Sequence, residues 1–148
     1  MKIFFRLVLL FTISITILSC SSNNSTGGQI NPNSVGTPFT LKYEIIASSP
    51  FNPPITGLPG NFIIYKNGTG QTEQDNNFSG TTWTKEITVT TTSRPFISSL
   101  GTTLYFNVPG TMTGNIYVNG NLVAHVQNPT QGGTSTYFST ISMSYLVN

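Results

Sequence analysis

Hydrophobic and polar residues alternate with a period of two along most of the chain after Pro38. The first alternating segment sets one apolar row, Phe39, Leu41, Tyr43, Ile45 and Ala47, against Thr40, Lys42, Glu44 and Ile46. Because successive side chains of a β-strand point to opposite faces, this pattern predicts a strand with one buried face. Further strands are predicted at residues 62–66, 71–75, 82–90, 95–100 and 104–108, in a hairpin over residues 114–127, and at residues 137–147. No ten-residue window has the pattern of a helix.

Glycine, proline and asparagine mark the turns between these segments. Asn67-Gly68 and Asn119-Gly120 are dipeptides that favour tight hairpin turns, in which residues take positive φ angles. Gly101 and Pro109-Gly110 are predicted to end short strands, and residues 128–133 are predicted to form a loop. In the second hairpin a two-residue turn predicts three cross-strand pairs: Val118 with Asn121, Tyr117 with Leu122, and Ile116 with Val123.

About eight short strands, with turn signals about every eight to twelve residues, are typical of a single antiparallel β-sandwich of the immunoglobulin-like kind. We predict one such domain over residues 38–148. A domain of this size buries enough surface for a core, so the apolar rows are expected to form that core rather than a ligand site. A small closed β-barrel is the alternative, because alternation alone does not distinguish two packed sheets from one closed sheet.

The N-terminal segment has the composition of a secretory signal peptide. Lys2 and Arg6 precede an apolar run from Leu7 to Leu18, which is short for a membrane-spanning helix. The residues Ile17-Leu18-Ser19-Cys20 resemble a bacterial lipobox, in which the cysteine thiol receives a diacylglycerol group. The resemblance implies a signal peptide over residues 1–19 and a lipoprotein carrying acyl chains such as palmitate at Cys20. The alternative is an uncleaved N-terminal anchor in which Cys20 is an incidental buried thiol.

Residues 20–37 are rich in Ser, Asn and Gly and hold little apolar surface. We predict a disordered tether, whose typical end-to-end distance would be roughly 20–25 Å. Ser21 stands where lipoprotein sorting of the enterobacterial type uses Asp to retain a protein in the inner membrane. The expected location is therefore the cell envelope, at the outer membrane facing the periplasm, with the membrane bound through Cys20.

The net charge of the chain falls to zero when the predicted signal peptide is left out. The whole sequence has six Lys and Arg against four Asp and Glu, but Lys2 and Arg6 lie within residues 1–19. The remaining four basic residues balance the four acidic ones, so we expect no nucleic-acid partner, which would require clustered basic side chains. Cys20 is the only cysteine, and an acylated thiol leaves none for a disulfide.

Few residues in the sequence could carry chemistry. His125 is the only histidine, and the Gly-x-Ser-x-Gly pattern of a nucleophile elbow is absent. We therefore expect neither an enzyme nor a cofactor, and His125 at the surface or rim of the domain.

One motif matches the spacing of a calcium-binding loop. Asp75, Asn77 and Ser79, followed by Gly80 and then Glu86, would place oxygen ligands around one cation. That loop normally lies between two helices, whereas both flanks here alternate with period two. A strand over residues 83–86 would carry Glu86 away from the other three, so coincidence is the favoured interpretation and no metal is predicted.

Four segments together resemble the extracytoplasmic domain of the small mycobacterial membrane protein family, MmpS. They are Tyr43-Glu44-Ile45; residues 63–68 with Thr72-Glu73-Gln74; Trp83-Thr84-Lys85-Glu86-Ile87-Thr88-Val89; and residues 114–124. The resemblance covers residues 41–147 and implies a membrane-tethered β-sandwich that serves as an accessory to exporters of lipids and siderophores. Where that family has a transmembrane helix, this chain has the lipobox-like segment.

Two functions follow as expectations. The first is a non-enzymatic binding or accessory module of the cell envelope that supports a protein partner such as a transporter. The alternative is a carrier of a small hydrophobic ligand, a lipid or a siderophore, held in a cavity between the sheets. No binding residues are predicted for either.

Overall fold

The computed structural model describes residues 38–52, 60–90 and 95–148. The predicted signal peptide, Cys20 and the tether lie outside these ranges. Within them the chain forms nine strands: β1 (Phe39–Ala47), β2 (Phe62–Lys66), β3 (Thr72–Asp75), β4 (Thr82–Val89), β5 (Phe96–Phe106), β6 (Thr111–Val118), β7 (Asn121–Pro129), β8 (Gln131–Gly132) and β9 (Tyr137–Val147).

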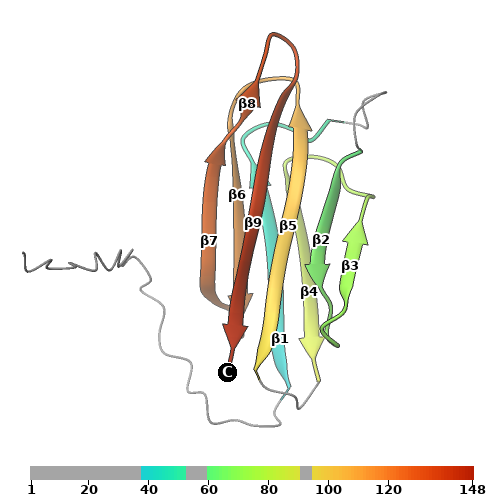
Figure 1. Ribbon diagram of the computed structural model, residues 1–148, viewed down its shortest axis with the longest axis vertical. Helices are drawn as coiled ribbons and strands as arrows, with labels where there is room; N and C mark the ends of the chain where they lie inside the picture. Colours follow the sequence, from blue (N-terminus) through green and yellow to red (C-terminus); the bar gives the residue numbers. More distant parts are fainter. Residues whose placement is uncertain (1–37, 53–59, 91–94) are drawn as a thin grey trace, which may run out of the picture.

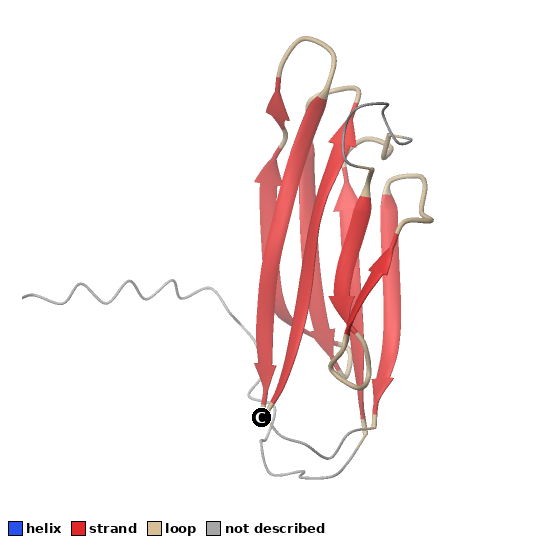
Figure 2. Cartoon of the chain, turned by 45° about the vertical axis from the view of Figure 1, so that its right-hand side comes forward, coloured by secondary structure: helices blue, strands red, loops and turns tan. Residues whose placement is uncertain are grey.

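The strands form two antiparallel sheets packed face to face (Figures 1 and 2). The first has the order β4-β1-β6-β7 and the second the order β3-β2-β5-β9-β8. The predicted antiparallel β-sandwich is therefore confirmed. The sheets are not closed into one barrel, so the barrel alternative is wrong. At one side the chain passes from β7 in the first sheet directly into β8 in the second.

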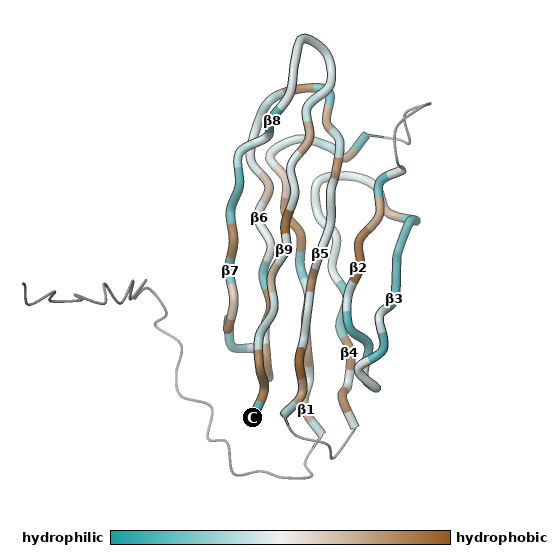
Figure 3. The backbone as a smooth tube through the Cα atoms, viewed as in Figure 1, coloured by the Kyte–Doolittle hydropathy of each residue, from teal (hydrophilic) through white to brown (hydrophobic). Residues whose placement is uncertain are grey.

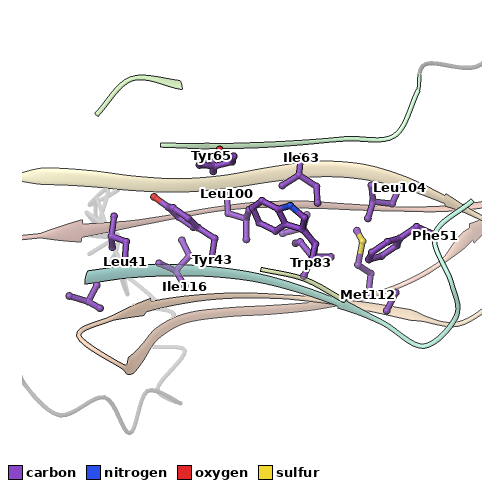
Figure 4. Close-up of a cluster of buried hydrophobic side chains, with 14 of the residues drawn as sticks. Leu41, Tyr43, Phe51, Ile63, Tyr65, Trp83, Leu100, Leu104, Met112 and Ile116 are labelled. Carbon is purple, nitrogen blue, oxygen red and sulfur yellow. The ribbon is translucent and has the colours of Figure 1, made fainter. Parts of the chain in front are cut away.

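The core lies between the sheets and follows the alternation of the sequence. On β1 the predicted apolar row is buried, and the hydropathy of the strands alternates along the chain (Figure 3). Figure 4 shows side chains of both sheets, among them Tyr43, Leu100 and Ile116, meeting in this layer. Burial of these side chains is the main force that holds the two sheets together.

Strand β5 corrects one prediction, because it runs through Gly101 without a break. The backbone at Gly101 pairs with Ile64 on β2 and with Ser142 on β9, so both neighbouring strands hold it in place. A Cβ atom at Gly101 would lie 3.1 Å from Cγ1 of Ile64. This glycine therefore makes room for a neighbouring side chain rather than ending a strand. Strand β8, which lies within the loop predicted at residues 128–133, is a second difference from the sequence reading.

The turn between β2 and β3 also differs from the prediction. It spans five residues, because Lys66 pairs with Thr72, and its positive φ belongs to Gly70 rather than to the Asn67-Gly68 pair. The side chain of Asn67 organises the loop by accepting hydrogen bonds from the backbone N–H of Thr69 and of Gln71, both at 3.0 Å. This local bonding favours a wider loop over a two-residue turn.

The β6–β7 hairpin has the predicted turn but not the whole predicted register. Asn119 and Gly120 have φ angles of 49° and 79°, and the pairs Val118–Asn121 and Tyr117–Leu122 are confirmed. Beyond them a bulge shifts the register, so that Ile116 pairs with Ala124 and the predicted pair Ile116–Val123 is wrong.

Burial explains the bulge. An unshifted register would set His125 opposite Gly114, whose Cβ position faces Ile141 in the core. With the extra residue in β7, Val126 takes that inner position and His125 lies opposite Asn115 on the outer face. Burying the polar ring of His125 would cost more free energy than the bulge, which interrupts the hydrogen bonds between β6 and β7 at one point.

The start of β1 and the end of β9 lie at the same end of the molecule (Figure 1). Phe39 contacts the ring of Phe96 with centroids 5.6 Å apart, and Phe96 pairs with Val147. Strand β8 and the loop that follows it lie at the opposite end. The sandwich thus has one end that carries the start of its first strand and another that carries β8.

Candidate functional site

The four residues of the calcium-type motif lie in different structural contexts. Asp75 ends β3, where its Oδ1 accepts a hydrogen bond from the backbone N–H of Asn77 at 2.8 Å and its Oδ2 accepts one from Nε1 of Trp83 at 3.0 Å. Ser79 is exposed beside Gly80, which has a φ of 81°. Glu86 lies in β4 opposite Lys42, on the exposed face of the strand, whereas the side chain of Trp83 is buried on the other face.

The carboxylate of Asp75 therefore ties β3 to β4 through an indole, a contact that the motif did not predict. The hydrogen bond from Trp83 is the main cause that lowers the pKa of Asp75. Glu73 is held in a similar way, because its Oε1 accepts from Nδ2 of Asn67 and its Oε2 from the hydroxyl of Tyr65, both at 2.8 Å. In the described ranges no group of three or more His, Cys, Asp or Glu residues is placed to hold a metal ion.

A second polar cluster lies on the outer face of the sheet β4-β1-β6-β7, and we call it the Glu44 network. Oε2 of Glu44 accepts hydrogen bonds from Nδ2 of Asn115 and from the hydroxyl of Tyr117, both at 2.9 Å. Its Oε1 lies 3.0 Å from Nζ of Lys42, and that ammonium lies 5.0 Å from the centre of the Tyr117 ring. The Glu44 side chain is only 13% exposed, although it stands on a face that no other element covers in the described structure.

Burial alone would raise the pKa of Glu44, but the hydrogen bonds from Asn115, Lys42 and Tyr117 outweigh it and lower the pKa. Burial, and then the hydrogen bond to Glu44, raises the pKa of Tyr117. The carboxylate is therefore ionised and the phenol protonated near neutral pH.

The network extends to His125 and fixes the orientation of its ring. Nδ1 of His125 lies 2.8 Å from Oδ1 of Asn115. Because the carboxylate of Glu44 can only accept, Asn115 must turn its NH₂ to Glu44 and its oxygen to the histidine. Nδ1 must then carry a proton and donate it to that oxygen.

Sequence reasoning placed His125 at the surface but did not connect it to Glu44, which is 81 positions earlier in the chain. The sequence does indicate that Lys42 and Glu44 lie on the outer face of β1, because they alternate with the apolar residues of that strand. The connection depends on the pair Asn115–His125, which only the bulge in the hairpin creates.

The lowered pKa of Glu44 has a consequence for acid stability. A carboxyl with a lower pKa in the folded state stabilises the fold above its unfolded pKa, about 4.3 for glutamate, and this stabilisation is lost as the pH falls through the folded pKa. We expect Glu44→Gln to be less stable than the parent at neutral pH and to lose less stability on acidification. Denaturant melts followed by the fluorescence of Trp83, at several pH values from about 7 to 3, test this. Two curves that stay parallel over the whole range would contradict it.

No family model matches the chain, and no curated protein matches it in sequence.

Proposed function

We propose that this protein is a lipid-anchored module of the bacterial cell envelope, held to the membrane through Cys20, which binds or supports a protein partner and performs no catalysis. The supporting observation is the lipobox-like segment Ile17-Leu18-Ser19-Cys20, which precedes the domain in the sequence. The tether predicted for residues 20–37 would join the domain at the end where β1 starts. That end would then face the membrane, and β8 with its following loop would face away from it.

The Glu44 network supports a binding role on this proposal. It holds a carboxylate, an ammonium and an imidazole in fixed positions on one outer face. Both carboxylate oxygens of Glu44 already have partners, so the group is poorly suited to act as a base. A fixed pattern of donors and acceptors is suited to recognition of a partner surface, for which a transporter or another envelope protein is the proposed class.

No helix in the described ranges is long and apolar enough to cross a membrane. The accessory role toward an exporter, which the MmpS resemblance implies, is part of the same proposal.

The carrier of a small hydrophobic ligand stays an untested alternative. It requires a cavity between the sheets, and the inward rows there are occupied by side chains that include the fully buried Tyr43, Phe106 and Met112. No observation in the described part of the chain favours the carrier over the anchored binding module.

Cys20→Ala tests the anchor. We expect the full-length variant to lose stable membrane attachment, because each buried CH₂ of an acyl chain contributes about 0.8 kcal/mol and two or more chains are needed to hold a protein on a bilayer. Cells grown with radiolabelled palmitate would be fractionated and the membranes washed in high salt.

Ser21→Ala is the matched control, since it changes the neighbouring residue and should keep both the label and the attachment. If Cys20→Ala remained in the washed membranes without label, attachment would come from another part of the protein. The anchor at Cys20 would then be wrong.

A further inference from the structure

Strand β9 forms the edge of its sheet over most of its length. It pairs with β5 from Tyr137 to Val147, whereas β8 pairs with it only at Tyr137 and Phe138. Figure 1 shows β8 beside the start of β9 alone. In the sheet order β3-β2-β5-β9-β8, residues 139–147 therefore have no second neighbouring strand in the described ranges.

Two side-chain hydrogen bonds show which backbone groups of β9 point away from β5. Oγ of Ser98, a residue of β5, donates to the backbone oxygen of Tyr145 at 3.0 Å, so this oxygen faces β5. Nδ2 of Asn128, a residue of β7, donates to the backbone oxygen of Thr140 at 2.7 Å, so this second oxygen faces away from β5. Because backbone groups alternate along a strand with period two, the even-numbered residues of β9 direct theirs away from β5.

The N–H and C=O groups of Ser142, Ser144 and Leu146 therefore point outward from the sheet, and we call these groups the open edge. All three residues are exposed, and no strand in the described part of the chain pairs with them. A row of unpaired backbone donors and acceptors is the surface on which a further β-strand is added to a sheet.

The sequence of β9 does not protect the open edge. Soluble proteins block free edges with charged side chains, prolines, bulges or very short strands. The other long edge strands have such features, because β4 carries Lys85 and Glu86, and β7 has a bulge and ends in Pro129. The eleven residues of β9 include no charged side chain and no proline, and their register with β5 has no shift.

A strand added at the open edge would also cover apolar side chains that the two sheets leave partly exposed. Ala124 and Val126 pair with inward residues of β6 and so point inward, yet each is only partly buried. Met143 and Tyr145, on the inner face of β9, are also only partly buried. By contrast, the inward residues of β6 are all buried, since β6 has a neighbouring strand on each side.

We propose that the open edge binds an extended, uncharged segment of the protein partner, which adds a strand beside β9. This inference rests on the proposed function only in taking the partner to be a protein. Main-chain hydrogen bonds would hold the segment, and its apolar residues at every second position would cover Val126 and Tyr145. The inward side chains of β7 and β9 carry no charge, which favours apolar partner residues over charged ones. The chain's own residues 20–37 suit the position poorly, because they are rich in Gly and Asn and include Pro32.

Hydrogen exchange followed by NMR, on the full-length protein in detergent, tests whether the edge is open. We expect the amides of Ser142, Ser144 and Leu146 to exchange about tenfold faster or more than those of Met143 and Tyr145, which face β5. Slow exchange at all five amides would mean that the edge is already paired, in a second copy of the chain or within it. That result would overturn the proposal.

A library of random peptides displayed on phage, selected against the same protein, supplies the added strand. We expect the enriched peptides to have apolar residues at every second position and to slow the exchange of the Ser142, Ser144 and Leu146 amides. Failure to enrich such peptides would overturn the proposal. Enriched peptides that leave the exchange of these three amides unchanged would overturn it as well.

Ser144→Pro and Ser144→Ala form a matched pair of variants. Both remove the hydroxyl, but only proline removes the outward N–H, which proline at an edge position can lose without breaking the pairing with β5. Ser144→Pro should lower the affinity for the enriched peptides about tenfold, the cost of one lost hydrogen bond, and Ser144→Ala should bind as the parent does. Equal affinities of the two variants would contradict pairing at the open edge.

Val126→Ala tests the apolar contact without changing the backbone of β9. It should lower the affinity about threefold or more, because the peptide then buries less apolar surface. Leu122→Ala is its control, since Leu122 is 44% exposed and pairs with Tyr117 on the outer face. Equal losses in the two variants would place the peptide elsewhere.

These measurements are independent of the lipid anchor. Peptide binding by a protein that Cys20 does not attach to the membrane would refute the anchor alone. A lipid-anchored protein that binds no peptide at β9 would refute the added strand alone.

Discussion

Replacing Ile45 with alanine is expected to lower the free energy of unfolding by about 2–5 kcal/mol, the usual cost of removing a large side chain from a packed core. Ile45 is fully buried on β1, the strand that pairs with both β4 and β6, and its backbone neighbours are Trp83 and Gly114. Removal of the side chain leaves a cavity at the centre of the layer between the sheets. Denaturant melts followed by the fluorescence of Trp83, the only tryptophan, would measure the loss.

The adjacent residue provides the control. Ile46 is chemically identical but 40% exposed on the outer face of the same strand. Ile46→Ala should therefore cost less than about 1 kcal/mol, since most of its surface remains in water in the folded protein. Equal losses for the two variants would mean that β1 does not present its odd-numbered residues to the core, and the packing of the two sheets described above would be wrong.

The second large effect is expected in the β6–β7 turn. Gly120 has a φ of 79°, a conformation that costs most other residues roughly 1–2 kcal/mol. A Cβ atom at Gly120 would meet nothing within 4 Å, so the cost of Gly120→Val is conformational rather than steric. We expect a loss of at least that size, because valine is β-branched and fits a positive φ poorly.

Gly133→Val is the matched substitution, because a Cβ atom there also meets nothing within 4 Å and Gly133 has no positive φ. It should change the free energy of unfolding by less than about 0.5 kcal/mol. The two variants differ only in the backbone conformation that they must adopt. A Gly120→Val protein as stable as Gly133→Val would contradict the two-residue turn.

Much of this fold was readable from alternation, because the inner rows of β1, β4 and β9 are set by burial and burial follows the sequence with period two. The ends of the strands were harder to predict from the sequence. Gly101 has the signature of a break, yet it lies inside β5, where a glycine makes room for Ile64. A glycine needed for space and a glycine needed for a turn look alike in a single sequence.

The polar clusters were the least predictable part, because they depend on contacts between distant strands. The pair Asn115–His125 follows from a bulge that the local sequence does not mark, and Asp75 accepts a hydrogen bond from the indole of Trp83 across two strands. In each case the sequence shows the residues themselves, but it does not show which residue of a neighbouring strand each of them contacts.

Mass spectrometry of the mature protein tests the proposed function most directly. The purified protein, extracted from membranes with detergent, would be analysed intact and after proteolysis. The lipid-anchored account predicts a chain that begins at Cys20 and carries a diacylglyceryl group on its thiol. A chain that retains residues 1–19 with an unmodified Cys20 would contradict it.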